Sequence, residues 1–296
     1  MASIRGGAMT RSRLVRTFLD SAEFRNRVAA EADHISEGMR VELPTFTIYV
    51  REAESAIGRA ICEQRVYEPE VQAAFEMVLR PGMTVVDAGC NIGYFTLLAA
   101  HKVGESGRVL AFDPSPINCR LLRKSAQENG FPHVHVREQP LGDREARYAF
   151  FEQNGNGMLL DLETHPNAAG WDALLTTAIL DELLREAGPV HVIKLDVEGA
   201  EYRVFRGARR IIETHRPVLI TEFAPGALEQ VSRVAPETYL EECRALDYRI
   251  FILEPDKPPG RFSGDGAEWV RLCRRRKVDH LNLLLAPPWL DAFGAS

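Results

Sequence analysis

Four carboxylates end short apolar runs of the chain, and these side chains are the first candidates for chemistry. Asp87, Asp113, Asp196 and Glu222 each close a run whose composition is that of a buried strand. Such runs alternate here with helical segments, which is typical of a parallel sheet covered on both faces. Ligands bind such sheets at the carboxyl ends of the strands, where the strand order reverses. The four carboxylates are therefore expected to share one acidic pocket, which suits a cationic ligand.

A glycine-rich turn follows the first of these carboxylates and indicates the kind of ligand. Gly89-Cys-Asn-Ile-Gly93 would link the strand to a helix, so that a ligand can approach the backbone and the free N–H groups of the first helical turn. The spacing is not the GxGxxG of dinucleotide-binding folds. We therefore predict S-adenosylmethionine, with Asp87 meeting its ammonium group or ordering the turn. Asp113 would accept hydrogen bonds from the ribose hydroxyls or, alternatively, help to cap the next helix.

A third group of charged residues surrounds the run that ends in Asp196. Methyl transfer to a hydroxyl requires an aligned acceptor and a base that removes its proton. Asp196 is the expected base, followed by Glu198, and Glu222 would orient the acceptor or share a divalent ion with Asp196. Alternatively, Asp196 and Glu198 only complement the dipole of the following helix. Glu201 is interpreted as structural, and Lys194, inside an apolar strand, needs a paired anion or an exit to solvent.

These segments together resemble the FkbM family of methyltransferases over roughly residues 45–285. The most specific element is Lys-x-Asp-x-Glu-Gly-x-Glu at residues 194–201, accompanied by Tyr67-Glu-Pro69, Phe112-Asp-Pro114 and Leu141-Gly-Asp143. The resemblance implies an α/β fold of the class I methyltransferase (Rossmann-like) type, whose seven-stranded sheet is mostly parallel, has helices on both faces and has an antiparallel last strand. It also implies methyl transfer, usually to oxygen on sugars or natural products and less often to nitrogen.

The residues that match these motifs give the expected site. Asp143 would contact adenine or only shape a turn, and Asp113 is shorter than the Glu that many relatives carry at its position. No metal ligand is predicted, although magnesium is compatible with the acidic residues. The expected cofactor-binding residues are Glu68, Asp87, Gly89, Asn91, Gly93, Asp113 and Asp143, and the expected catalytic residues are Asp196, Glu198 and Glu222.

Local sequence patterns predict the elements that position these residues. Residues 1–66 are expected to form a helical and strand extension that serves as a substrate lid or a dimer contact, and residues 67–296 the catalytic domain. Residues 151–172 and 254–268 are expected to be loops that cover a substrate, and Arg274-Arg-Arg-Lys277 a solvated turn. Strands are expected at 46–51, 84–86, 108–112, 134–136, 190–195, 218–221, 249–253 and 280–285, and helices near 10–35, 69–79, 93–102, 116–129, 200–213 and 237–246.

The charge and composition of the chain favour some classes of partner and compartment and argue against others. The net charge of −6 argues against nucleic acid, whose binding needs a basic surface. No run approaches the roughly 18 apolar residues of a membrane span, and no signal peptide is recognised. Five cysteines without a CxxC pair indicate reduced thiols in a cytoplasmic protein. A small-molecule or glycan acceptor is expected, and a homodimer is compatible with the N-terminal extension.

Three rival functions stay open at this point. N- or carboxyl-methylation uses the same cofactor and differs only in the acceptor. A nicotinamide-dependent oxidoreductase would use the same sheet edge, but the missing GxGxxG argues against it. A third class is a catalytically inactive nucleoside-binding module, although the intact glycines and acids argue against such a loss of activity.

Overall fold

The computed structural model describes residues 38–51, 56–153, 156–163, 170–261 and 264–290. The helix expected over residues 10–35 lies outside these ranges. None of the described helices is long and apolar enough to cross a membrane.

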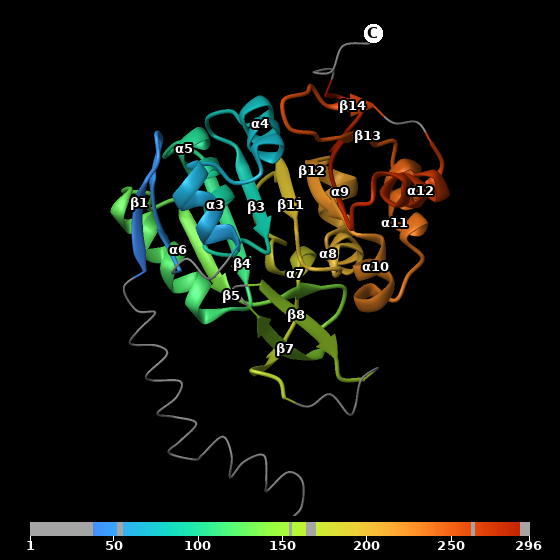
Figure 1. Cartoon of the computed structure of the whole chain (residues 1–296), viewed down its shortest axis with the longest axis horizontal. Coiled ribbons are helices and arrows are strands. Elements are labelled where there is room, and N and C mark those ends of the chain that lie inside the picture. The colour runs from blue at the N-terminus through green and yellow to red at the C-terminus, as the bar shows by residue number, and fades with distance from the viewer. Residues whose placement is uncertain (1–37, 52–55, 154–155, 164–169, 262–263, 291–296) are drawn as a thin grey trace, which may run out of the picture.

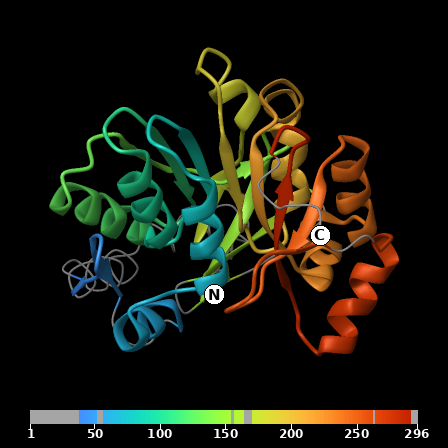
Figure 2. The ribbon, with the colours of Figure 1, turned by 90° about the horizontal axis from the view of Figure 1, so that it is seen from above.

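A central sheet with helices on both faces forms the body of the protein (Figures 1 and 2). The expected class I methyltransferase fold is confirmed, because five neighbouring strands are parallel and β15 runs antiparallel to both of its main neighbours. A two-residue strand, β14, adds an eighth member at one edge. The order is β5(Val134–Glu138), β4(Arg108–Asp113), β3(Thr84–Ala88), β11(Val192–Leu195), β12(Val218–Phe223), β15(Leu281–Ala286), β13(Arg249–Ile252) and β14(Gly260–Arg261).

The strand order reverses between β3 and β11, and the register aligns their carboxyl ends. Asp87 is the Cα partner of Lys194, and Leu195 is the partner of Thr221, the residue before Glu222. The strand-end residues of β3, β11 and β12 therefore lie in one row at the same edge.

Two hydrophobic clusters cover the two faces of the sheet, because successive strand residues point to opposite sides. Val85 and Val109 belong to the first cluster, whereas Val86 and Leu110 belong to the second. The first cluster packs against α4(Pro69–Val78), α5(Tyr94–Val103) and α6(Pro116–Glu128), and the second against α8(Glu201–Gly207), α9(Arg209–His215), α11(Pro236–Ala245) and α12(Gly266–Arg276). Short elements complete the fold: β6(Leu141–Gly142), β10(Ala178–Ile179), α7(Leu180–Leu183), α10(Pro225–Ala227) and the π-helix η1(Leu228–Ser232).

The described part of the N-terminal extension contacts α6 through its hairpin. It consists of the hairpin β1(Met39–Glu42)–β2(Thr47–Val50) and the helix α3(Ala56–Gln64). The backbone N–H of Tyr49 donates to Ser125 Oγ at 2.9 Å, and Ile48 belongs to the first hydrophobic cluster. The division at residue 66, with its lid or dimer role, stays a prediction.

Two expected loops contain regular structure, which corrects the sequence analysis. Residues 151–172 include most of the hairpin β7(Arg147–Gln153)–β8(Asn156–Asp161), which pairs with β9(Ala173–Thr176) in a separate sheet. The guanidinium of Arg203 on α8 anchors this hairpin, because it contacts Asp161 at 3.2 Å and the Tyr148 hydroxyl. The glycines in the sequence around residue 155 suggested a loop instead of strands, and a buried ion pair, which the sequence does not reveal, fixes the hairpin.

The second correction concerns the C-terminal loop and the basic run. Residues 254–268 contain β14 and the start of α12, which Asp265 and Glu268 begin with a capping box. Arg274, Arg275 and Arg276 form the last turn of α12 and not a turn outside it. Basic side chains suit that position, because they complement the negative end of the helix dipole.

Candidate active site

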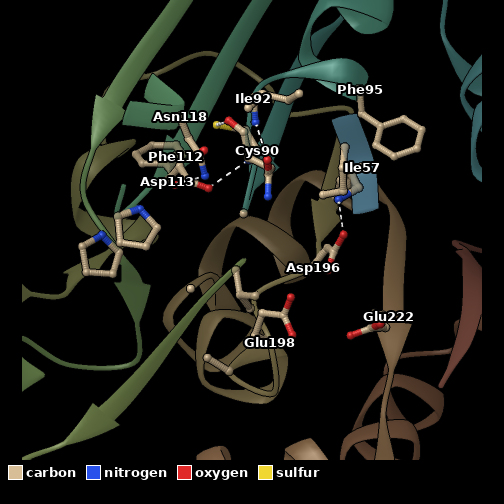
Figure 3. A pocket seen from close by; sticks show the side chains of 18 of the residues that line it. Ile57, Cys90, Ile92, Phe95, Phe112, Asp113, Asn118, Asp196, Glu198 and Glu222 are labelled. Atoms are coloured by element: carbon tan, nitrogen blue, oxygen red, sulfur yellow. Dashed lines mark hydrogen bonds and ion pairs between the residues drawn. The ribbon is translucent and has the colours of Figure 1, made fainter. Parts of the chain in front are cut away.

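A cavity of about 310 Å³ opens at the carboxyl-terminal edge of β3, β4, β11 and β12 (Figure 3). Its walls combine the glycine-rich turn after β3 with carboxylates from five separate segments. The structure therefore brings both halves of the expected site to one cavity. Seven of the ten expected site residues line it, namely Glu68, Gly89, Asn91, Asp113, Asp196, Glu198 and Glu222.

The other three expected residues do not line the cavity. Asp87 is fully buried and accepts a hydrogen bond from Thr96 Oγ1 at 2.5 Å, so that it ties the end of β3 to α5. Burial raises the pKa of Asp87, against the opposing effect of the Lys194 ammonium. Gly93 begins α5 with a φ of 93° and packs against α6. Asp143 is exposed to solvent.

The glycine-rich turn is built around Asp113. Its Oδ2 accepts the N–H of Asn91 at 2.9 Å, and its Oδ1 accepts the N–H of Ser115 at 2.9 Å. One carboxylate thereby fixes the turn after β3 and the start of α6. Asp113 also lines the cavity, so that its capping role is observed and its cofactor-binding role stays a prediction.

Gly89 allows the turn to lie directly against the loop after β11. Its φ is +78°, and a Cβ there would overlap the carbonyl oxygen of Asp196. Only glycine adopts that backbone conformation at little cost and leaves that space. The glycine-rich turn and the carboxylate loop on the cavity wall are thus in backbone contact.

Lys194 and Asp196 form an ion pair within the cavity wall. Their Nζ and Oδ2 atoms are 2.8 Å apart, and only 5% of the Lys194 side chain is exposed. Burial lowers the pKa of Lys194, but the charges of Asp196, Asp87 and Glu68 outweigh this effect and hold the pKa above its ordinary value. The ammonium therefore stays charged, and Asp196 is the anion that the sequence required for this buried cation.

Three glutamates complete the acidic side of the cavity (Figure 3 shows Glu198 and Glu222). Burial first, and then the neighbouring Asp196, raise the pKa of Glu222 to about 10 and that of Glu68 to about 7. The same two causes raise the pKa of Glu198. Glu222 therefore keeps its proton at neutral pH and can donate a hydrogen bond to a ligand.

Glu201 holds the loop that carries Asp196 and Glu198 through hydrogen bonds to the loop backbone. Its Oε1 accepts the N–H groups of Val197 at 2.8 Å and Gly199 at 3.1 Å, while Ser232 Oγ donates to Gly199 O at 2.6 Å. Glu201 is fully buried, as a structural role requires. The loop adopts left-handed backbone at Glu198 (φ 53°) and Gly199 (φ 94°).

Left-handed backbone recurs around the cavity at residues other than glycine. Glu68 has a φ of 43° and Asn91 a φ of 48°, in addition to Glu198. Such conformations cost about 1 to 2 kcal/mol for an L-residue and persist where the surroundings enforce them.

Several lining residues were not identified from the sequence. Tyr67 packs on Phe95 with ring centroids 5.9 Å apart, and Phe95 also lies 5.1 Å from the Lys194 ammonium. The β8 strand contributes Gly157 and Leu159. Tyr67 belongs to the Tyr67-Glu-Pro69 motif, and Phe95 follows the glycine-rich turn, so both lie in segments that the sequence analysis singled out. No sequence pattern pointed to Gly157 and Leu159 of the β7–β8 hairpin. Gln139, Pro140, Leu141, Asp279 and His280 also line the cavity.

The acidic residues do not form a recognisable metal centre. Among the residues that the structure describes, no group of three or more His, Cys, Asp or Glu side chains is arranged to hold a metal ion. The ammonium of Lys194 already occupies one side of Asp196.

Comparison with known proteins places this geometry in a family. A family model described as methyltransferase FkbM domain matches residues 87–250, more than half of the 296-residue chain. Methyltransferase 1 of Beauveria bassiana (strain ARSEF 2860) is 29% identical over 143 residues, which are 42% of this chain and 57% of that protein. Ribosomal RNA large subunit methyltransferase E of Legionella pneumophila (strain Lens) is 35% identical over 71 residues, 24% of this chain and 33% of that protein. These alignments span less than two thirds of either relative.

Solved structures of methyltransferases overlap with the fold in part. The FkbM methyltransferase from Methylobacillus flagellatus KT gives a TM-score of 0.43 at 17% identity, covering 89% of this chain and 60% of that one. A SAM-dependent O-methyltransferase from Thermotoga maritima gives 0.41 at 13% identity, covering 85% and 86%. The assignment rests on the family model and not on these scores. The chain belongs to the methyltransferase FkbM family.

Proposed function

We propose that this protein transfers the methyl group of S-adenosylmethionine to a hydroxyl oxygen of a sugar or natural-product acceptor. The observation that carries the proposal is the single cavity shared by the glycine-rich turn and the carboxylate loop. Family membership supports methyl transfer as the reaction. S-adenosylmethionine supplies a methyl group that is already activated by a positive sulfur atom.

The cofactor half of the cavity has the hydrogen-bond acceptors and walls that a nucleoside requires. Asp113 offers carboxylate oxygens for ribose hydroxyls, and the turn at Asn91 brings backbone close to the ligand. Phe112 and Leu141 provide apolar surface for the nucleobase. Gly89 leaves no side chain in this space. These residues would hold the nucleoside, while the acids beyond them face the cationic sulfur.

The acceptor half favours a neutral hydroxyl compound over an anion. Asp196, Glu198 and Glu222 approach one another there, and an anionic group beside them would be repelled. A protonated Glu222 can donate a hydrogen bond to a hydroxyl oxygen and orient it. Asp196, held by Lys194, can accept one from a second hydroxyl. The catalytic roles of the three carboxylates stay predictions.

An amine is the second candidate acceptor, because the same carboxylates would bind an ammonium group. Such an acceptor must lose its proton before it attacks the methyl group. The raised pKa values of Glu68 and Glu198 favour a cationic guest, since a neighbouring positive charge restores their ionised forms. N-methylation is therefore tested beside O-methylation.

Calorimetry and labelled transfer test the proposal together. The protein is titrated with S-adenosylhomocysteine and with NAD, and tritiated S-adenosylmethionine is then offered with methyl hexosides, glucosamine and glucose 6-phosphate. We expect S-adenosylhomocysteine to bind and NAD not to bind, with label in the hexosides and none in the phosphate. Asp113→Ala should weaken binding, whereas Asp196→Ala should spare binding and slow transfer. Binding of NAD alone, or label only in the phosphate, would contradict the proposal.

A further inference from the structure

His280 reaches the acceptor side of the cavity from the last strand of the sheet. It directly precedes β15, which runs antiparallel to β12, so that the beginning of β15 lies beside the carboxyl end of β12. The register pairs Glu222 with Asn282, two residues after His280. The imidazole lines the cavity, and 40% of its side chain is exposed, which leaves a path for a proton to reach solvent.

The contacts of the ring define which nitrogen faces a ligand. His280 Nδ1 lies 2.8 Å from Asp279 Oδ1 and 3.6 Å from Glu222 Oε1. The hydrogen bond with His280 lowers the pKa of Asp279, whose carboxylate therefore accepts and cannot donate. In the neutral ring Nδ1 thus carries the hydrogen, and Nε2 keeps its lone pair. Within the described residues, both recorded contacts of the ring use Nδ1.

Acidic groups on several elements face this imidazole. Glu68 at the start of α4, Glu198 after β11 and Glu222 at the end of β12 are all electrostatically coupled to it, in addition to Asp279 on its own turn. The charge of His280 lowers the pKa of both Glu68 and Glu198, although burial raises them overall. The ionised Asp279 would stabilise the imidazolium that forms when the ring accepts a proton, and the positive ring favours the ionised forms of Glu68 and Glu198.

An imidazole suits the task better than the carboxylate expected from the sequence. Histidine is the side chain that most often serves as a general acid or base in enzymes, and the free lone pair on Nε2 can accept a proton directly. The Oδ2 atom of Asp196 is already in contact with the Lys194 ammonium at 2.8 Å. Its oxygens remain suited to orienting the acceptor.

We infer that His280 is the general base of the transfer, with Asp279 and Glu222 orienting its Nδ1 edge. This inference rests on the proposed function. The acceptor hydroxyl gives its proton to Nε2 while its oxygen forms a bond to the methyl carbon. The bond from that carbon to sulfur breaks, and its electron pair stays on sulfur. His280 becomes an imidazolium and returns the proton to solvent.

Nitrogen NMR of the histidine rings tests the geometry without an acceptor. The complex with S-adenosylhomocysteine is compared with the His280→Gln variant, which identifies the His280 signals. Above the pKa of the ring we expect the tautomer with hydrogen on Nδ1 and a bare Nε2. The opposite tautomer, or a ring that stays protonated up to pH 9, would overturn the inference.

The pH dependence of kcat tests the proton transfer to His280. The acceptor is a methyl hexoside or glucosamine, whichever of the two the wild-type protein labels. His280→Gln should lower kcat by about 10² to 10⁴-fold, leave S-adenosylhomocysteine binding unchanged and remove the acidic limb of the profile. His135→Gln is the matched control, because His135 is exposed on the far edge strand β5 and should leave kcat unchanged. A His280→Gln variant with the wild-type kcat and profile would refute the base role.

The two proposals fail in distinguishable ways. If the wild-type protein binds NAD and not S-adenosylhomocysteine, the proposed function is wrong, whatever the tautomer of His280. If the wild type binds S-adenosylhomocysteine and labels an acceptor, but His280→Gln does so equally well, only the base assignment is wrong.

Discussion

Gly89→Ala tests the backbone contact between the two halves of the cavity. The new Cβ would overlap the carbonyl oxygen of Asp196 and lie 2.8 Å from its carbonyl carbon, and 3.2 Å from a methyl group of Val197. Two costs add up. Left-handed backbone at alanine costs about 1 to 2 kcal/mol, and forcing an extra carbon into a packed site costs about 1 to 3 kcal/mol. The variant should lose about 2 to 5 kcal/mol of unfolding free energy.

Gly130→Ala separates these two costs. Gly130 also has a positive φ, +66°, but its added Cβ would meet nothing within 4 Å. Only the backbone cost of about 1 to 2 kcal/mol applies to it. At about 2 °C per kcal/mol for a chain of this size, thermal unfolding should shift down by about 2 to 4 °C for Gly130→Ala and by about 4 to 10 °C for Gly89→Ala.

Calorimetry provides the second measurement. Displacing the Asp196 backbone should weaken S-adenosylhomocysteine binding at least about tenfold in Gly89→Ala, a free-energy loss of about 1.4 kcal/mol, and leave it unchanged in Gly130→Ala. Equal melting temperatures and equal affinities for the two variants would refute the inferred contact.

Two further substitutions examine buried charges near the cavity. Burial raises the pKa of Glu201 from 4.5 to about 7. Between these two pH values the folded protein holds a proton that the unfolded chain has lost. The unfolding free energy therefore falls as pH rises from 4.5 to about 7. As pH rises from 4.5 to 8, the unfolding free energy of Glu201→Gln should therefore increase by on the order of 3 kcal/mol relative to that of the wild type, as measured by urea unfolding. If the unfolding free energies of the two proteins changed equally with pH, this prediction would be contradicted. Arg203→Met removes the buried partner of Asp161 and should cost about 3 kcal/mol, since Arg144 keeps its contact with Asp161. The loosened β7–β8 hairpin should also raise the acceptor KM without changing S-adenosylhomocysteine affinity, and an unchanged KM would exclude the hairpin from acceptor binding.

The strand-end carboxylates could be predicted because one rule places them. Parallel strands share the edge at which they end, so Asp113, Asp196 and Glu222 needed only correct strand assignments to be brought together. Asp87 obeys the same rule, yet its side chain points to Thr96 beneath the turn. The rule predicts the edge that a residue occupies and not the direction of its side chain.

The same rule explains why His280 was missed. In the antiparallel last strand it is the beginning, and not the end, that lies at the functional edge. The β7–β8 hairpin was missed for another reason, since its position depends on the pairing of Arg203 with Asp161, two residues far apart in sequence. Asp143 was expected from a motif alone, and the cavity is lined instead by the residues just before it, Gln139 to Leu141.

The left-handed residues on the cavity wall limit how far this protein can be made heat-resistant. Substitution by glycine would relieve about 1 kcal/mol or more of backbone strain at Glu68, Asn91 or Glu198. Selection for stability at high temperature would therefore favour glycine at these positions, and each such change at a glutamate removes a carboxyl group that lines the cavity. Thermal tolerance and turnover are thus opposed at these positions, and laboratory evolution for one should erode the other.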